Sequence, residues 1–310
     1  MAQKTHAIGI DIGGTHISCA VADIETGTLL ESTHARATFD HKAPSGEILQ
    51  HWTDALNQTL ANSDASQLIG FGFAIPGPFD YRNGISRMQH KFEGLLGVHI
   101  PDALRSGLAA VQTLPMRFIN DATAFAIGES WMGEGLGLRK VVVITLGTGF
   151  GSAFLDDDVP VVQGADVPSE GCLWHLPFRD GIADDYFSTR WFTKMYAEQS
   201  GHRVPGVKTL MDKATVDPVA GQLFETFGQN LAECLGPWLL RFGAEVLIIG
   251  GNIAHALPLF GPALRKGLQA SWVSTRITPS VLWEKAALLG SARLLDDAFW
   301  AKVSVHLPTL

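Results

Sequence analysis

Two glycine-rich turns, each placed between apolar runs, are the features of this sequence that best suit chemistry. The first turn is Gly13-Gly14-Thr15, which lies between the apolar runs Ile8–Ile12 and Ile17–Ala22. This pattern predicts a β-hairpin whose turn carries almost no side chains. Glycine lets a backbone approach a ligand closely, and the N–H groups of such a turn can bind phosphate oxygens. Asp11 comes just before the turn, where its carboxylate could hold Mg²⁺ through water.

A tight turn beside a buried aspartate would explain one such motif equally well, and no Walker A lysine follows the glycines. The pattern recurs, however, in residues 143–155, where Gly147-Thr148-Gly149 separates two further apolar runs. Two bare hairpin turns on two similar halves are what a nucleotide cleft between duplicated domains requires. A third glycine pair, Gly250-Gly251, ends a buried apolar run and is followed by Asn252.

Asn120 and Asp121 follow the short predicted strand Arg117–Ile119 and precede a helical pattern over Ala122–Gly133. Aspartate is a favoured N-cap, so Asp121 could have a purely structural role at the start of this helix. The carboxyl ends of strands in open α/β sheets are also where ligands bind. Position alone leaves both interpretations open.

The composition restricts the classes of function. The 310 residues are 46% apolar and 17% charged, which suits two lobes with buried cores. The net charge is −8 and no basic run of five or more residues occurs, which argues against nucleic-acid binding. The three cysteines lack CxxC spacing and predict a reducing compartment. Without a signal segment or a long apolar run, we expect a soluble cytoplasmic protein that does not bind membranes.

The remaining periodicities predict an α/β architecture with strands and helices in alternation. In the first half we expect a strand near Thr28–Thr33, a helix over Ser45–Ala61, a buried strand over 68–75 that runs into Pro76-Gly77-Pro78, and a helix over Pro101–Leu108. The second half should contain a hairpin over Val141–Leu146 and Gly151–Leu155, a loop-rich stretch from Asp156 to Gly181, a strand near Glu245–Ile249, and helices over Asp184–Gln199, Val216–Phe242 and Glu284–Trp300. The last helix could cross back to the first lobe.

With these motifs the sequence resembles the ROK family of sugar kinases, within the actin/hexokinase-like ATPase superfamily. The matching segments, in the family's order, are Asp11–Thr15, Pro76–Pro78, Asn120–Ala122 with Glu129, Leu146–Gly151, Ile249–Asn252 and Ala287–Ala292. The resemblance implies a two-lobed, ribonuclease H-like α/β fold with a mixed sheet in each lobe and the active site in the cleft between them. We expect the first lobe to span residues 1–121, joined by a C-terminal helix of about 293–310, and the larger second lobe to span 122–292.

The resemblance also implies roles for individual residues. Asp11, Gly13, Gly14 and Thr15, with Gly147, Thr148 and Gly149, would hold the phosphates of ATP, and Asp11 would position Mg²⁺. Gly250, Gly251 and Asn252 would flank the adenosine. Asp121 would be the catalytic base, and Asn120 would bind sugar hydroxyls near Gly77. A positioned carboxylate, backbone donors and a metal are what phosphoryl transfer from ATP requires.

The sugar loop departs from the family pattern. Family members commonly carry Glu-x-Gly-His followed by a zinc loop rich in cysteine. Here His175 corresponds to the histidine, but Cys172 stands where the glutamate is expected and Glu170 is offset by two residues. Asp184 matches a second sugar-binding glutamate and is one methylene shorter, although it could equally be a solvated helix start. We expect sugar contacts from Glu170, His175 and Asp184, and no zinc site.

The leading hypothesis is an ATP- and Mg²⁺-dependent hexose kinase that acts on glucose or a relative at the 6-hydroxyl. N-acetylmannosamine, fructose and allose remain open, and polyphosphate is a less favoured donor. A sugar-responsive repressor of the same family is disfavoured, because the first phosphate strand begins by Ile8 and leaves no room for a DNA-binding domain. A sugar-binding regulatory protein without kinase activity is the alternative. The family implies a homodimer, to which Trp174, Trp191 and Trp238 could contribute if they are not core residues.

Overall fold

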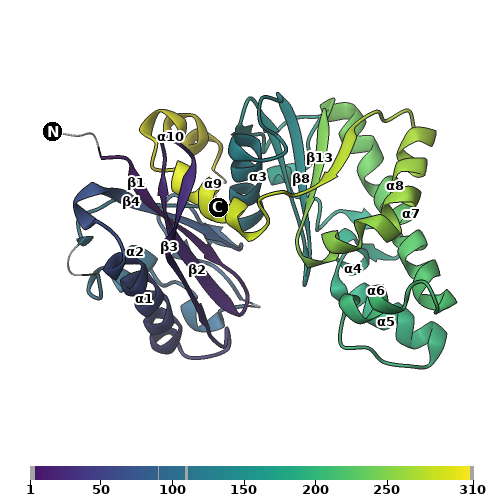
Figure 1. The fold of residues 1–310 in the computed structure, drawn as a ribbon, viewed down its shortest axis with the longest axis horizontal. Helices are drawn as coiled ribbons and strands as arrows, with labels where there is room; N and C mark the ends of the chain where they lie inside the picture. The colour runs from purple at the N-terminus through teal and green to yellow at the C-terminus, as the bar shows by residue number, and fades with distance from the viewer. Residues whose placement is uncertain (1–3, 90, 109–110, 308–310) are drawn as a thin grey trace. The chain divides into compact units, whose positions relative to one another are not determined.

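The computed structural model describes residues 4–89, 91–108 and 111–307, which form two compact units. Unit 1 contains Met1–Gly133 and Glu284–Leu310, and unit 2 contains Glu134–Trp283. The first and last segments of the chain therefore share one unit, as Figure 1 shows by the purple and yellow ribbons. This division differs from the expected limits at residues 121 and 292, because helices α3 (Asp121–Met132) and α9 (Glu284–Arg293) both belong to unit 1.

The contact between α3 and α9 explains that difference. A methyl group on Gly290 would lie 1.8 Å from the carbonyl oxygen of Ala124, and one on Gly128 would lie 2.0 Å from that of Ala286. The two backbones can approach this closely only because glycine occupies both positions. Since α9 also packs on the first sheet, where Ser291 Oγ accepts the Ile10 N–H at 3.1 Å, the two helices are part of unit 1.

The sheet of unit 1 has the strand order β3-β2-β1-β4-β7. Strands β1 and β2 form the predicted hairpin, β2 and β3 are antiparallel, and β1, β4 and β7 are parallel. Asp11 lies opposite Ala74 and Ile75 lies opposite Asn120, so the carboxyl ends of the three parallel strands meet at one edge. The strands are β1 (His6–Ile12), β2 (His16–Asp23), β3 (Thr28–Thr38), β4 (Leu68–Ile75) and β7 (Met116–Asn120), with a short pair β5 (Phe79–Asp80) and β6 (Ile85–Ser86).

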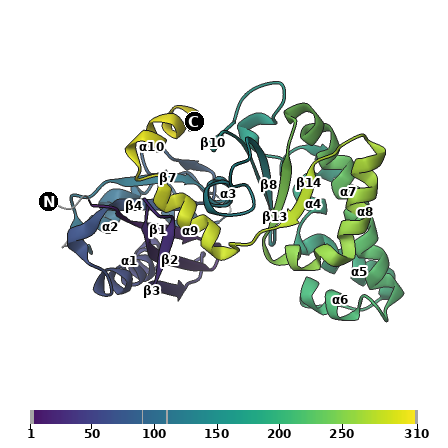
Figure 2. The same ribbon diagram turned by 45° about the horizontal axis from the view of Figure 1, so that its top comes forward.

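Helices cover both faces of this sheet (Figure 2). Helix α1 (Ser45–Ala61) matches its predicted limits and buries Ile48, Trp52 and Leu56 at the predicted spacing of four. The opposite face carries α9, whose Leu288 backbone touches Gly9. The expected helix Glu284–Trp300 is two helices, because Asp296 accepts the N–H groups that start α10. The remaining helices of unit 1 are α2 (Ile100–Arg105), α10 (Asp297–Val303) and the 3₁₀ turns η1 (Ala65–Gln67), η2 (Glu93–Leu95) and η6 (Ser304–His306).

The sheet of unit 2 repeats the scheme of unit 1. Its order is β10-β9-β8-β13-β14, with an antiparallel β8–β9 hairpin and β13 parallel to both β8 and β14. Thr145 on β8 lies opposite Gly250 on β13, so the loops that follow these strands meet at one edge. The strands are β8 (Lys140–Leu146), β9 (Phe150–Asp156), β10 (Val159–Pro160), β13 (Val246–Gly250) and β14 (Arg276–Pro279), with a short pair β11 (Pro177–Phe178) and β12 (Gly181–Ile182).

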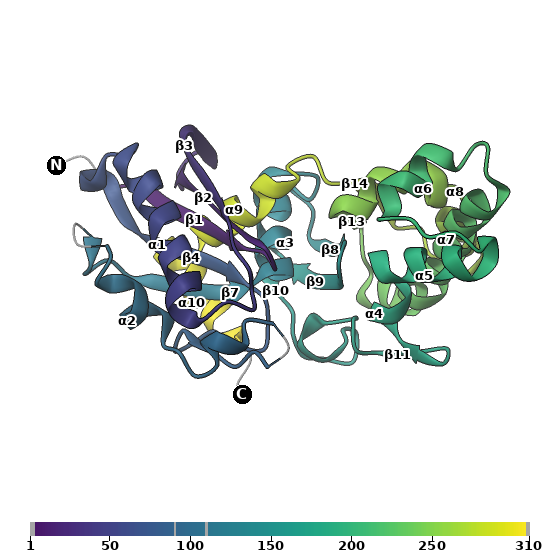
Figure 3. The same ribbon diagram turned by 90° about the horizontal axis from the view of Figure 1, so that it is seen from below.

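Unit 2 contains the larger helical layer, in which α5 to α8 lie together (Figure 3). The expected helix Asp184–Gln199 is divided because Ser188 is extended, with φ −132° and ψ 166°. Helix α7 matches the predicted Val216–Phe242 except that it begins after the N-cap Asp217. The helices are α4 (Ala183–Tyr186), α5 (Thr189–Ser200), α6 (Val207–Lys213), α7 (Pro218–Phe242) and α8 (Leu257–Ala270), with the 3₁₀ turns η4 (Ser169–Gly171) and η5 (Asn252–Ala256).

Aromatic side chains fill the core of unit 2. Phe187, Phe192, Phe227 and Phe260 are fully buried, and their rings contact one another or share neighbours. Trp191 belongs to this core, since only 6% of its surface is exposed. Trp238 is partly buried and packs against the same core. Trp174 is 48% exposed. In the described part of the chain, no helix is both long enough and apolar enough to cross a membrane.

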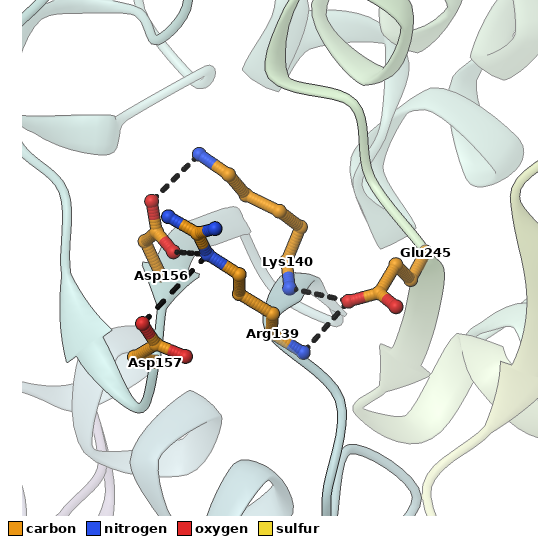
Figure 4. A network of polar contacts seen from close by, with 5 residues as sticks. All are labelled: Arg139, Lys140, Asp156, Asp157 and Glu245. Atoms are coloured by element: carbon orange, nitrogen blue, oxygen red, sulfur yellow. Dashed lines mark hydrogen bonds and ion pairs between the residues drawn. The ribbon is translucent and has the colours of Figure 1, made fainter.

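A charged cluster joins three strand ends at the edge of the unit 2 sheet opposite the glycine turns (Figure 4). Glu245 Oε2 accepts the backbone N–H groups of Arg139 and Lys140 at 2.7 Å each. The side chains of the same two cations contact the Asp156 carboxylate at 2.8 and 2.7 Å. This cluster holds the beginning of β8 against the end of β9 and the start of β13.

Candidate active site

In unit 1 the predicted site residues gather at the carboxyl edge of the parallel strands. Asp11 is the last residue but one of β1, Gly77 follows β4, and Asn120 ends β7. The strand register places Asp11, the end of β4 and Asn120 at the same edge of the sheet, which is where ligands bind in open α/β sheets. Asp11, Asn120 and Asp121 are all half-buried, so each presents part of its side chain to solvent.

Asn120, and not Asp121, is the N-cap of α3. Its Oδ1 accepts the N–H groups of Ala122 and Thr123 at 3.0 and 3.2 Å. Asp121 was a candidate for this role by residue type, but it is the first residue of the helix and not its cap. The Asp121 carboxylate accepts the adjacent Ala122 N–H at 2.9 Å. A carboxylate that is not required as the cap can take part in proton transfer.

Tyr81 was not predicted and supports Asn120 from the side. The Asn120 Nδ2 atom donates to Tyr81 Oη at 3.5 Å, and that hydroxyl donates to the Ile75 carbonyl oxygen at 3.1 Å. With its oxygen committed to the helix cap, the Asn120 amide can offer only N–H donors to a ligand. No spacing in the sequence indicates this contact, because Tyr81 lies in the turn between β5 and β6 and meets β7 only in the folded unit.

The pKa shifts of the Asp11 and Asp121 carboxylates suit a site that binds a cation. Burial, and then the negative charges of Asp121 and Glu284, raise the pKa of Asp11 to about 7 against the opposing effect of Arg36. Burial also raises the pKa of Asp121, although the Ala122 N–H and Lys91 work in the other direction. Carboxylates whose pKa is raised by burial, and for Asp11 also by the neighbouring charge of Asp121, would be stabilised as anions by a nearby dication.

A magnesium ion suits this edge only as a partner of the substrate. The described residues contain no group of three or more His, Cys, Asp or Glu side chains that could hold a metal. Mg²⁺ commonly binds through one or two carboxylates together with waters and substrate phosphates, so a complete protein cage is not needed. Asp11 could supply such a carboxylate.

The first glycine turn is closed by backbone hydrogen bonds. Gly13 N–H donates to the His16 carbonyl at 2.8 Å, and the Phe39 N–H donates to that of Thr15 at 3.0 Å. A methyl group on Gly13 would lie 2.6 Å from the His16 ring, whereas one on Gly14 would meet no atom within 4 Å. Gly14 and Thr15 are exposed. The turn is therefore bare at its tip, as phosphate binding would require.

The second glycine turn, in unit 2, is held by side chains from α4 and α5. The Thr189 N–H and hydroxyl both donate to the Gly147 carbonyl, at 2.8 and 3.0 Å. Arg190 Nη1 donates to the Thr148 carbonyl at 3.3 Å. Asp184 Oδ1 accepts the Phe150 N–H at 2.7 Å, directly after Gly149. Sequence reasoning missed Thr189 and Arg190, which carry no motif of their own.

The third glycine segment lies beside the second turn. Gly251 has φ +80°, and a methyl group there would lie 2.4 Å from the Leu146 carbonyl oxygen at the end of β8. Both observations require glycine at this position. Asn252 follows it, is exposed and begins η5. The structure therefore brings Gly147–Gly149 and Gly250–Asn252 to one edge of the unit 2 sheet, as predicted.

The predicted sugar loop of unit 2 is ordered by Ser152. Its hydroxyl donates to the Gly171 carbonyl and accepts the Leu173 N–H, both at 2.9 Å. Glu170 is exposed with φ 58°, and the Cys172 thiol donates to the Glu170 carbonyl at 3.5 Å. His175 is half-buried beside the Trp174 ring. The loop places His175 near Asp184, because the Asp184 N–H donates to the Trp174 carbonyl at 2.9 Å.

The segment after His175, where the resemblance would place a cysteine loop, is the short β11–β12 hairpin. Arg179 at its tip donates to Asn230 at 2.8 Å and pairs with Glu233 at 2.9 Å, both on α7. The Tyr186 hydroxyl donates to Asp180, and Asp185 accepts the Ile182 N–H at 3.1 Å. Hydrogen bonds and ion pairs thus hold this segment.

A family model described as "ROK family" matches residues 7–302. The chain belongs to the ROK family. It is 28% identical to a glucokinase of Thermotoga maritima, over 95% of this chain and 98% of the relative. It is 25% identical to an N-acetyl-D-glucosamine kinase of Pectobacterium carotovorum, over 80% of this chain and 84% of the relative.

Solved structures of ROK proteins share the fold. A ROK family glucokinase from Streptomyces griseus, in complex with glucose and AMPPNP, superposes with a TM-score of 0.75 at 22% identity, covering 93% of this chain and 98% of that one. A ROK family transcriptional regulator, homolog of the E. coli MLC protein, gives 0.75 at 17% identity over 97% of this chain and 80% of that one. The fold is therefore common to kinases and a regulator of this family.

Proposed function

We propose that this protein is an ATP- and Mg²⁺-dependent sugar kinase that transfers the γ-phosphoryl group to a hydroxyl of glucose or a related hexose, at O6. The observation that carries the proposal is the duplicated hairpin turn, bare in both units, together with a carboxylate at Asp121 that the helix cap leaves available. Similarity along almost the whole chain to a glucokinase supports the same reaction class.

Asp121 is proposed as the general base. It would accept the proton of the attacking hydroxyl while the oxygen forms its bond to phosphorus and the bond to the leaving ADP oxygen breaks. A raised pKa makes the carboxylate a stronger base once it is ionised, and its place at the first turn of α3 fixes its direction. Bound Mg²⁺ would neutralise charge on the phosphates and, near Asp11, favour the ionised form of that carboxylate.

The donor is proposed to bind through backbone groups. The turns Gly13–Thr15 and Gly147–Gly149 would donate N–H groups to the phosphates, because a methyl group on Gly14 or Gly147 would meet no protein atom within 4 Å and space is open there. Gly250–Asn252 would adjoin the nucleoside. Backbone N–H groups would therefore supply many of the contacts to the phosphates, with Mg²⁺ supplying positive charge.

The acceptor sugar is proposed to contact Asn120 and His175, with Gly77 and Glu170 nearby in their own units. Asn120 would donate to a hydroxyl oxygen, since its own oxygen caps α3. His175 can donate or accept, which suits hydroxyl groups. Cys172, a weak hydrogen-bond partner, stands where the resemblance places the sugar glutamate, and Glu170 is offset by two residues, so hexose preference need not match that of the relatives.

The test is an ADP-release assay with ATP and Mg²⁺ over hexoses and N-acetylhexosamines, including glucose, N-acetylglucosamine, N-acetylmannosamine, fructose and allose. We expect one sugar to be turned over and Asp121→Asn to lose that activity. Polyphosphate in place of ATP serves as the second donor. A wild-type protein that binds a sugar by calorimetry and releases no ADP with any sugar would contradict the proposal.

A sugar-binding regulatory protein is the second candidate, because a family regulator shares the fold. The altered loop at Cys172 favours this reading, whereas Asp11, Asn120, Asp121 and three glycine segments in kinase order do not. The two candidates differ in a direct observable. A regulator should bind sugar but not phosphorylate it. It should also show no Mg²⁺-dependent binding of a nucleotide.

A further inference from the structure

Asp184 makes internal contacts with both of its carboxylate oxygens. Oδ1 accepts the Phe150 N–H at 2.7 Å, and Oδ2 pairs with Arg190 Nη2 at 2.5 Å. The side chain is only 21% exposed, whereas that of Arg190 is 60% exposed. Oδ1 is turned toward the β8–β9 hairpin and Oδ2 toward Arg190 of α5, so each oxygen already has a partner within unit 2.

The contacts of Asp184 converge on the second glycine turn. A methyl group on Gly149 would lie 3.1 Å from Asp184 Oδ1, so the carboxylate lies directly against the turn. Arg190, the partner of Asp184, also donates to the Thr148 carbonyl at 3.3 Å. One carboxylate and one guanidinium therefore hold consecutive peptide groups of the turn, from Thr148 to Phe150.

The backbone of Asp184 contacts the loop that carries His175. Its N–H donates to the Trp174 carbonyl at 2.9 Å. Asp184 thus joins two segments of unit 2, the glycine turn through its side chain and the His175 loop through its main chain. Asp185, the next residue, shares neither contact and instead accepts the Ile182 N–H of the β11–β12 hairpin.

We propose that Asp184 is a positioning residue for the phosphate-binding turn and not a sugar ligand. Acting with Arg190, it fixes the Gly147–Gly149 backbone in the form that receives the donor phosphates. This proposal rests on the proposed function, because it assigns the turn to the nucleotide. It leaves His175 and Glu170 as the contacts that unit 2 offers to the sugar, and so places sugar selection on the altered loop around Cys172.

The test separates nucleotide binding from sugar binding in Asp184→Asn. Asparagine keeps an acceptor for the Phe150 N–H and removes the charge that holds Arg190. We expect the Kd for Mg²⁺-AMPPNP, measured by calorimetry, and the KM for ATP to rise about three- to tenfold, since a partly exposed charge-assisted contact is lost. The sugar Kd should change less than about twofold.

Two further variants make the result specific. Arg190→Gln should weaken nucleotide binding similarly, and the double variant should be no weaker than the stronger single one, because both act through one contact. Asp156→Asn is the matched control, since it removes an aspartate paired with cations at the other end of the same hairpin. Its nucleotide and sugar affinities should equal those of the wild type.

Each contrary result has a distinct meaning. A sugar Kd about tenfold weaker in Asp184→Asn, with unchanged nucleotide affinity, would make Asp184 a sugar ligand and overturn the proposal. Unchanged affinity for both ligands would also overturn it. If the wild type binds no Mg²⁺-AMPPNP, the proposed kinase function fails first, and the positioning role falls with it. If Asp184→Asn does not fold, Arg190→Gln decides the question by the same two affinities.

Discussion

The two glycine turns look alike in sequence but are supported in different ways. Gly13–Thr15 is closed by hydrogen bonds between backbone groups of β1, β2 and the residue after β3. Gly147–Gly149 has one backbone hydrogen bond of its own, from the Gly147 N–H to the Gly149 carbonyl at 3.1 Å. It is held in addition by side chains of Asp184 on α4 and of Thr189 and Arg190 on α5. The first turn should therefore be less sensitive to distant substitutions than the second, which depends also on the charge and length of side chains outside its motif.

The largest effect on activity is expected at Asp121, the proposed base, which belongs to neither glycine turn. Asp121→Asn should lower kcat about 10²- to 10⁴-fold, because it removes the proposed base while Asn120 still caps α3. Thermal unfolding should be nearly unchanged and sugar binding retained. ADP release under saturating substrates measures the loss. A variant with more than about a tenth of the wild-type kcat would assign the base elsewhere.

Glycine substitutions distinguish structural from functional glycines. Gly251→Ala should lower Tm strongly, since the residue has φ +80° and a methyl group would lie 2.4 Å from the Leu146 carbonyl oxygen. The backbone strain alone costs about 1–3 kcal/mol, and the steric clash adds to it. Gly14→Ala and Gly147→Ala meet no atom within 4 Å and should leave Tm unchanged. Both should nevertheless weaken Mg²⁺-AMPPNP binding in calorimetry. Unchanged nucleotide affinity in both would remove these turns from the donor site.

Two substitutions of Asn120 can separate its role as the N-cap of α3 from its proposed contact with the sugar. Asn120→Ala should destabilise unit 1 by about 0.5–2 kcal/mol, because the N–H groups of Ala122 and Thr123 lose their acceptor. Asn120→Asp keeps an acceptor and should retain most of that stability, but it loses the amide donor and should raise the KM for sugar. Denaturant unfolding and steady-state kinetics measure the two effects. Equal stability of both variants would contradict the capping role.

The stability of the protein is expected to depend on pH through the ionisation of Asp11. Burial and the Asp121 charge raise its pKa to about 7 in the folded protein, above its value of about 4 in the unfolded chain. The folded state therefore binds the proton more tightly, and this group costs stability progressively as pH rises from about 4 to 7. Asp11→Asn should raise Tm little at pH 4 and most at pH 8 when Mg²⁺ is absent. A pH-independent difference would show that Asp11 is not perturbed.

The smallest effect is expected at the opposite end of the second hairpin. Asp156→Asn removes ion pairs with Arg139 and Lys140, of which Arg139 is largely exposed (Figure 4). Partly exposed pairs contribute about 0–1 kcal/mol, so Tm should fall slightly and less in high salt. A loss as large as that of Gly251→Ala would show that the charged cluster is a main support of the sheet.

The sequence was most informative where a local pattern determines the structure. The spacing of Ile48, Trp52 and Leu56 predicted α1 with its correct limits, and both glycine hairpins formed as expected. Asn120 and Asp121 are both good N-caps, so their order in the helix could not be decided from residue type. The division of the chain was missed for a different reason, because it depends on the backbone contact at Gly128 and Gly290, which joins distant segments.

Side-chain partners of the site were the least predictable. Tyr81 and Arg190 lie outside every motif and reach Asn120 and the second turn only through the folded chain. The assignments of Asp121, His175, Glu170 and the glycine turns to individual ligand groups remain predictions. What the sequence could predict was their gathering at strand ends, since parallel strands place the residues that follow them at one edge.

The glycine contact between α3 and α9 also bears on how the protein is made. The helix that carries Asp121 packs against a segment that begins at Glu284, so this packing partner leaves the ribosome only after the whole of unit 2. Until then, the faces of β1 and β4 that later pack against Leu288 and Ser291 remain uncovered. Contacts of such long sequence separation slow folding and expose apolar surface to aggregation. Unit 2, which is continuous in sequence, can fold first and unit 1 is completed last.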